Sequence, residues 1–138
     1  MKEIVFILSS LCDPHFRKRV EEFAEHGYKV KVYGYKRHNQ NIQQFPVEPH
    51  ILGEISNRNY LKRLRLFYTS IKSIAKECKG KLCFYSSLDI AMFARALIKS
   101  PYIYEICDLT ELCVGNEILS KLLIWQNKKT VKHSYKTI

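Results

Sequence analysis

The sequence contains few of the residues that interrupt or cross-link a chain. Its 138 residues include 5 glycines and 4 prolines, too few for a collagen-like chain or a flexible linker, and a hydrophobic content of 46% excludes intrinsic disorder. No apolar run approaches the ~20 residues that a membrane-spanning helix needs. The amino-terminal apolar stretch, Ile4 to Leu8, is shorter than the ~7–15 residues of a secretory signal, so we expect a buried strand there. Length and composition therefore indicate one globular domain.

The 5 cysteines follow no known binding or cross-linking pattern. Their number is odd, none forms a C-x-x-C pair, and their spacing fits neither a zinc module nor a disulfide framework. We therefore expect free thiols in a reducing cytoplasm. We also expect no metal site, because the histidines show no metal-ligand spacing either.

Positive charge is what the sequence has in excess. Lys and Arg number 23 against 13 Asp and Glu, which gives a formal net charge of +10. A charge of this size in one domain favours an anionic partner, which can be nucleic acid, anionic lipid or a phosphorylated small molecule. Charge alone does not choose among these three.

Strand-like and helix-like patterns alternate along the chain. Ile4 to Leu8 is a continuous β-branched and aromatic run typical of a central strand, and Tyr28 to Tyr33 alternates with period two. A long polar loop is expected over 34–49. The predicted strands are 4–8, 28–33, 50–53, 81–85, 102–107 and 135–138, and the predicted helices are 14–26, 60–78, 86–97 and 117–133. This order predicts an α/β fold with a doubly wound parallel sheet of about six strands, in a single domain over 1–138.

The predicted pattern stops in the middle of a repeat. The strand at 135–138 has no helix after it, although a strand in a doubly wound sheet is normally covered on both faces. We expect that the chain is cut before a second domain. A short natural domain whose last strand lies at an edge of the sheet is the alternative.

The segment after the first strand is the most informative candidate site, because ligands of open α/β sheets bind beyond the carboxyl ends of the strands. It contains no glycine, which argues against tight binding of NAD or FAD and against a Walker A loop. It carries three candidate residues, Asp13, His15 and Arg17. Arg17 lies near a helix amino terminus, where a nearby anion would favour a cation, but an ion pair with Glu21 explains it equally well. A helix cap likewise explains Asp13.

Two further segments supply candidates for the same edge of the sheet. Ser86 and Ser87 follow the fourth strand, and Glu105 and Asp108 lie at the end of the fifth. An acidic residue in an apolar strand needs a partner, because an unpaired buried charge is costly. Glu105 is therefore either a structural carboxylate held by a Lys, Arg or Tyr, or a cleft residue that binds sugar hydroxyls. Asp108 either faces a ligand or caps a turn.

The helix predicted over 60–78 is strongly basic, and with its flanks it has one acidic residue, Glu77. Leucines and aromatics beside the cations are typical of a helix that lies on anionic headgroups, where each cation contributes ~1 kcal/mol. The candidates for this contact are Lys62, Arg63, Arg65 and Lys72. An ordinary amphipathic helix with a solvated basic face is the alternative.

Three segments, taken together, resemble part of a known family. Residues 13–33 (DPHFRKRVEEFAEHGYKVKVY) are similar to the pattern R-x-x-x-x-x-x-L-x-x-x-G-[YH]-x-V-x-V. The parts that match are Arg17, Phe23 in place of the leucine, Gly27, Tyr28, Val30 and Val32, with one residue fewer between Arg17 and Phe23. FYSSLD at 84–89 is similar to a D-[VI]-[IV]-H-x-H strand end, and YEICDL at 104–109 is similar to Y-E-x-H-D-L. In this order and spacing they resemble the amino-terminal half of family 4 glycosyltransferases of the GT-B type.

The chain departs from that family where its histidines stand. Neither histidine of the earlier motif is kept, since Ser86 and Ser87 stand in that segment, and Cys107 occupies the place of the histidine in the later motif. The roles of those histidines therefore do not transfer. Arg17, Glu105 and Asp108 do align, as cleft candidates, and no catalytic residue is assigned.

The resemblance implies that residues 1–138 are the Rossmann-like, acceptor-side half of a two-domain enzyme. The missing carboxyl-terminal domain of the same chain would bind the nucleotide-sugar donor, with no metal or other cofactor. The whole enzyme would transfer a sugar to a lipid-linked or polysaccharide acceptor in bacterial surface-glycan synthesis. It would lie in the cytoplasm, peripherally on the inner face of the cell membrane. Residues 1–138 alone are expected to be inactive.

A stand-alone basic α/β module that binds RNA or an anionic membrane is the alternative. Binding to oligonucleotides or vesicles that weakens steeply with salt would identify it. Nucleic acid is not favoured as a partner, because aromatics such as Tyr28, Tyr33 and Phe84 fall in predicted strands and do not alternate with the basic residues.

Overall fold

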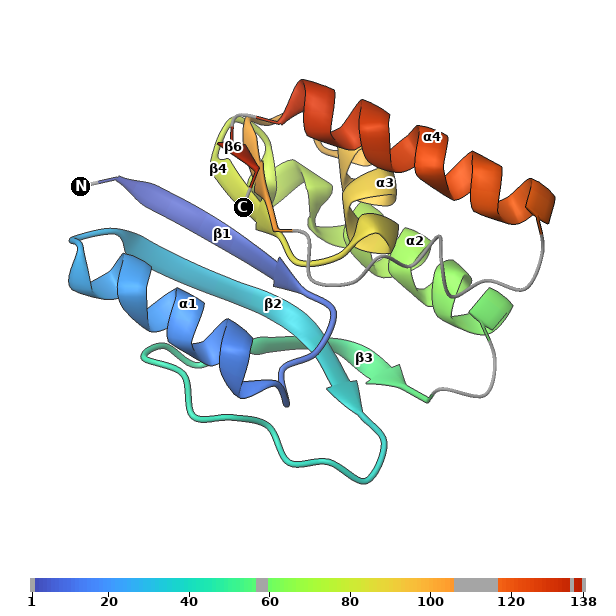
Figure 1. The fold of residues 1–138 in the computed structure, drawn as a ribbon. Helices are drawn as coiled ribbons and strands as arrows, with labels where there is room; N and C mark the ends of the chain where they lie inside the picture. The colour runs from blue at the N-terminus through green and yellow to red at the C-terminus, as the bar shows by residue number, and fades with distance from the viewer. Residues whose placement is uncertain (1, 57–59, 106–116, 135, 138) are drawn as a thin grey trace.

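The protein is built around a parallel sheet. The computed structural model describes residues 2–56, 60–105, 117–134 and 136–137. Its six strands lie in the order β3-β2-β1-β4-β5-β6, and every neighbouring pair is parallel (Figure 1). The strands are β1 (Glu3–Leu8), β2 (Lys29–Arg37), β3 (His50–Ile55), β4 (Leu82–Tyr85), β5 (Tyr102–Tyr104) and β6 (Lys136–Thr137), and the helices are α1 (Pro14–Glu25), α2 (Tyr60–Cys78), α3 (Leu88–Leu97) and α4 (Glu117–His133). The predicted doubly wound α/β fold is confirmed.

Helices cover both faces of the sheet. Helix α1 lies on one face, and α2, α3 and α4 lie on the other (Figure 1). The central strand shows why: Ile4, Phe6 and Leu8 belong to the core on the α1 side, whereas Val5 and Ile7 belong to the core on the α2 and α3 side. A strand buried on both faces has no polar positions, which explains the uninterrupted apolar run in the sequence.

Most of the predicted element boundaries are confirmed. Asp13 caps α1, since its Oδ1 accepts a hydrogen bond from the backbone N–H of His15 at 2.9 Å, and Pro14 begins the helix. Gly27, at φ +86°, follows the end of α1. Helices α2 and α4 begin and end at the predicted residues. Strand β5 ends at Tyr104, so Glu105 follows the strand and the prediction of a strand through it is wrong, whereas the predicted residues 106–107 lie outside the described residues.

The predicted end of the second strand is wrong. Strand β2 continues through Gly34 to Arg37, with an irregular register against β3 next to Gly34. The glycine is there because the segment after β1 packs over the strand, and a Cβ at this position would lie 2.6 Å from the Leu11 side chain. The segment 38–49 is also tied to the domain: the Gln43 N–H donates to the carbonyl oxygen of Leu11 at 2.9 Å, and Phe45 is only 8% exposed.

The order of the strands defines one special position in the sheet. From β1 the chain passes to β2 and β3 on one side and then to β4, β5 and β6 on the other side. The switch point therefore lies between β1 and β4, and the crevice beyond the carboxyl ends of these strands is where such sheets bind ligands.

Candidate functional site

Two serines meet at the switch point. Ser86, which follows β4 and is buried, accepts a hydrogen bond from the Ser9 N–H at 2.8 Å and donates to the Ser9 hydroxyl at 3.3 Å. Ser87 caps α3, since its hydroxyl accepts from the Ile90 N–H at 3.3 Å. These bonds fix the ends of β1 and β4 against each other, so both predicted serines lie at the expected edge and both have structural partners.

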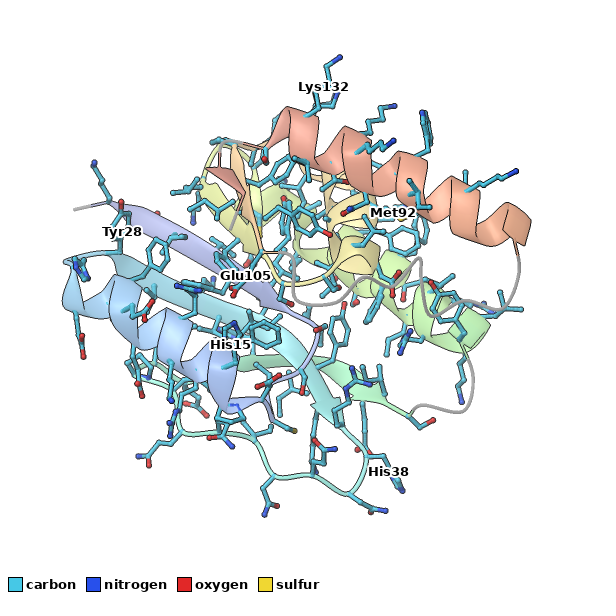
Figure 2. All side chains as sticks on the ribbon, in the orientation of Figure 1. His15, Tyr28, His38, Met92, Glu105 and Lys132 are labelled. Carbon is cyan, nitrogen blue, oxygen red and sulfur yellow. The ribbon has the colours of Figure 1, made fainter. Side chains whose placement is uncertain are left out.

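Next to the switch point, three charged or titratable side chains form what we call the Glu105 cluster: His15, Arg19 and Glu105. His15 and Glu105 approach each other from α1 and from the end of β5 (Figure 2), with His15 Nε2 at 2.5 Å from Glu105 Oε1. Arg19 donates from Nε to Oε2 at 3.3 Å and from Nη2 to Oε1 at 3.1 Å. The carboxylate, only 4% exposed, is therefore held from two sides by α1.

The cluster compensates its own charges. The hydrogen bond to Glu105 raises the pKa of the Arg19 guanidinium, although burial opposes this. Because a carboxylate only accepts hydrogen bonds, His15 donates to Glu105 from Nε2, and Nδ1 is the ring nitrogen that this bond leaves unused. Among the described residues Nδ1 has no hydrogen-bond partner, and the His15 side chain is 52% exposed. Nδ1 of His15 is thus left for a hydrogen bond with a ligand.

The remaining candidates at this edge lie in less informative places. Arg17 faces Glu21, with its Nε at 3.7 Å from Oε1, which supports the ion pair between positions four apart. Asp13 is the cap of α1, and Asp108 lies outside the described residues.

Arg19 is a residue of the cluster that the sequence did not single out. The spacing of four between His15 and Arg19 puts both on one face of α1, beside the buried Phe16 and Val20. This spacing is a signal in the sequence that the two side chains share a face, and the structure shows that Glu105 is their common partner.

A second charged group lies at the same edge of the sheet, beyond β2 and β3. A hollow of about 390 Å³ is lined by residues from the ends of these strands and from the start of α2, among them Glu54, Lys62 and Arg63. We call it the arginine hollow. Arg63 is only 21% exposed, with its Nη2 at 3.7 Å from Asp89 Oδ2 and its guanidinium 4.9 Å from the centre of the Tyr60 ring. Arg63 thus points into the domain and does not belong to an outward basic face.

The other three basic candidates of α2 are exposed. Lys62 is exposed at the arginine hollow, whereas Arg65 and Lys72 are exposed outside it, and Lys72 Nζ lies 5.8 Å from the centre of the Tyr68 ring. Two exposed apolar side chains, Leu61 and Tyr68, accompany them. Cations beside exposed apolar groups suit a surface helix on anionic headgroups, and an ordinary solvated helix shows them as well.

Other kinds of site find no support in the described part of the chain. Three cysteines, Cys12, Cys78 and Cys83, are unpaired and buried there. In the same ranges no three His, Cys, Asp or Glu side chains are grouped so that they could hold a metal ion. None of the described helices is both long and apolar enough to cross a bilayer.

The strand order, with its switch point between β1 and β4, defines a Rossmann-like α/β domain. No family model and no curated protein sequence matches the chain significantly. In structure the chain is similar to the sucrose-phosphate synthase of Thermosynechococcus elongatus, with a TM-score of 0.67 and 14% sequence identity. The match covers 99% of this chain and 42% of the synthase, so residues 1–138 span less than half the length of the synthase. At this identity the likeness shows a shared fold.

Proposed function

We propose that residues 1–138 are the acceptor-side lobe of a GT-B type glycosyltransferase, whose second lobe binds the nucleotide-sugar donor. The observation that carries the proposal is the fold match, which covers 99% of this chain and 42% of a sucrose-phosphate synthase, an enzyme that by its name makes a sugar product. The three segments that resemble family 4 glycosyltransferases point the same way. Two lobes that face each other would close a cleft over the switch point between β1 and β4.

In this proposal the Glu105 cluster binds the acceptor. The exposed Nδ1 of His15 accepts a hydrogen bond from an acceptor hydroxyl, while Glu105 and Arg19 hold the imidazole ring in place. A site whose ring orientation is fixed before binding loses little entropy when the acceptor arrives. The departing diphosphate would be stabilised by preorganised donors and helix termini, which requires no metal.

The acceptor is proposed to be lipid-linked or a polysaccharide, in bacterial surface-glycan synthesis at the inner face of the cell membrane. The support is the exposed basic side of α2, where Arg65 and Lys72 accompany Leu61 and Tyr68. Flotation with vesicles of phosphatidylglycerol tests this part. Binding that disappears in Arg65→Gln/Lys72→Gln and in neutral vesicles supports it, and equal binding to neutral vesicles contradicts it.

Sugar transfer itself is tested with the longest natural polypeptide that contains residues 1–138. It is incubated with radiolabelled UDP-glucose, UDP-galactose, UDP-N-acetylglucosamine and GDP-mannose together with a bacterial lipid extract. We expect label in the extract with one donor, and none when residues 1–138 are used alone. Transfer by residues 1–138 alone, or none by the longer polypeptide with any donor, would contradict the proposal.

A further inference from the structure

We propose that the arginine hollow is a binding site for a phosphate group, with Arg63 and Lys62 as its principal ligands and Arg37 as a third cation beside it. The hollow lies where β2 and β3 end and α2 begins, and His38 lies beyond the end of β2 (Figure 2). Three separate features of this place are unfavourable without an anion.

The first feature is the unused hydrogen-bonding capacity of Arg63. A guanidinium carries five N–H donors. Its Nε is buried and has no hydrogen-bond partner among the described residues. The facing carboxylate oxygen of Asp89 lies 3.7 Å from Nη2, beyond hydrogen-bond distance, and the contact with the Tyr60 ring uses no N–H acceptor. A buried donor left unpaired is costly, so an acceptor in the hollow would be bound favourably.

The second feature is the charge of the first turn of α2. This turn carries Lys62 and Arg63 and no acidic residue, although the amino end of a helix dipole disfavours cations. An anion bound between the helix end and these cations would interact favourably with both the helix dipole and the cations.

The third feature is the proximity of a second arginine. Burial, and next to it the charge of Arg63, lower the pKa of the Arg37 guanidinium, while Cys12 and Asp13 act in the opposite direction. Two like charges that approach each other in a partly desolvated place repel strongly. Of the acidic residues nearby, Glu54 is engaged with His38 at 2.8 Å, and Asp89 faces Arg63.

One bound anion relieves all three conditions together. A phosphate group suits the place better than a single carboxylate, because its several oxygens can take the fork of an arginine and a lysine at once. A hollow of about 390 Å³ also has room for part of the group that the phosphate is attached to. That this phosphate belongs to a substrate of sugar transfer rests on the proposed function, whereas the binding itself does not.

The test is calorimetric titration of the full 138-residue chain at constant ionic strength. The probes are inorganic phosphate, glucose 6-phosphate, farnesyl phosphate and uridine diphosphate, which represent free phosphate, a sugar-phosphate acceptor, a lipid-linked acceptor and the donor. We expect one saturable site for which the probes compete, and the tightest probe identifies the source. The highest probe concentration is ~10 mM, which lies well above the dissociation constant expected for a charge-assisted site. No saturable binding of any probe up to this concentration would overturn the proposal.

Matched variants locate the site. Arg63→Gln should weaken binding about tenfold or more and Lys62→Gln about threefold, because each removes charge-assisted hydrogen bonds. Lys76→Gln is the control, since Lys76 is exposed on the same helix but outside the hollow. Should Arg63→Gln fail to fold, Lys62→Gln against Lys76→Gln still decides. Equal weakening by these two lysine variants would show general charge attraction and overturn the proposal.

The two proposals fail separately. Phosphate binding in the hollow without sugar transfer by the longer polypeptide would remove the proposed function and leave the site. Sugar transfer with no phosphate binding that depends on Lys62 or Arg63 would do the opposite.

Discussion

The Glu105 cluster and the arginine hollow lie at the same edge of the sheet but differ in how far their buried charged groups are hydrogen-bonded. In the cluster, the buried carboxylate of Glu105 receives hydrogen bonds from Arg19 and His15 at 2.5–3.3 Å. In the hollow, the nearest carboxylate to Arg63 is 3.7 Å away and its Nε has no partner among the described residues. A buried carboxylate that accepts several hydrogen bonds is satisfied within the fold, whereas a buried N–H donor without an acceptor marks a place where a ligand can supply one.

Among the variants that test this difference, Glu105→Gln is expected to have the largest effect on the stability of the fold. The variant removes the charge that Arg19 and His15 bind and places an amide donor against the guanidinium. The free energy of unfolding should fall by about 2–3 kcal/mol, the range for lost hydrogen bonds to charged groups. Urea denaturation measures it, with Glu22→Gln as the control, because the exposed Glu22 bonds to Arg19 only. A loss below about 0.5 kcal/mol, as for a surface pair, would show that the cluster does not stabilise the fold.

The next effect concerns the exposed member of the cluster. In the sugar-transfer assay, His15→Ala should raise the KM for the acceptor about tenfold, since one hydrogen bond to the acceptor is lost. The KM for the donor should stay unchanged. His26→Ala, on the same helix but at its carboxyl end, is the matched control. Equal KM values for His15→Ala and His26→Ala would remove His15 from the acceptor site.

The rise in Tm that phosphate causes should depend on the arginine hollow and not on the Glu105 cluster. At ten times its dissociation constant a ligand stabilises the folded state by about 1.4 kcal/mol, which raises the Tm of a domain of this size by about 5 °C. Arg63→Gln should lose this shift, whereas Glu105→Gln, although less stable, should keep it. A shift that survives in Arg63→Gln would place the anion elsewhere.

The smallest effect is a pH dependence beside the hollow. Burial raises the pKa of the Asp89 carboxyl, and the Tyr60 hydroxyl and Arg63 only partly oppose this. The pKa of the Asp89 carboxyl is thus higher in the folded than in the unfolded chain. Its contribution to stability is fully present below the unfolded pKa, and it is lost as the pH rises through the folded pKa. Asp89→Asn, which stays neutral, should lose less stability than the natural chain over this rise. Urea denaturation at a series of pH values measures it, with the exposed Glu25→Gln as control, and parallel curves would contradict it.

Much of the fold could be predicted from local patterns. The apolar run of β1, the cap at Asp13 and the amphipathic stripe of α2 depend on neighbours within a turn or a strand, and each appears where the sequence predicts it. The error at Gly34 has a non-local cause. A glycine in a strand pattern suggests a turn, but here it admits Leu11, a residue more than twenty positions away in the chain.

The site could be predicted only as an edge of the sheet. The parallel order places the ends of β1, β4 and β5 together, so Ser86, Glu105 and His15 were expected near one another. Which arginine meets Glu105 depends on the direction of each side chain from α1, and Arg19 rather than Arg17 reaches it. The hollow was missed because Lys62 and Arg63 of α2 meet the ends of β2 and β3 only in the folded domain.

The central claim is that ligands bind at the carboxyl edge of the sheet, across both regions. The opposite edge offers an internal control, with a hollow of about 480 Å³ and charges that are paired there, Lys29 and Lys81 with Glu3 at 3.5 and 3.7 Å. Amide NMR during titration with glucose 6-phosphate, which carries both a phosphate and sugar hydroxyls, tests the claim most directly. We predict chemical-shift changes at 13–19, 37–38, 55–56 and 60–63. Changes confined to 2–3, 29–31 and 80–82, or none at saturating ligand, would contradict the account.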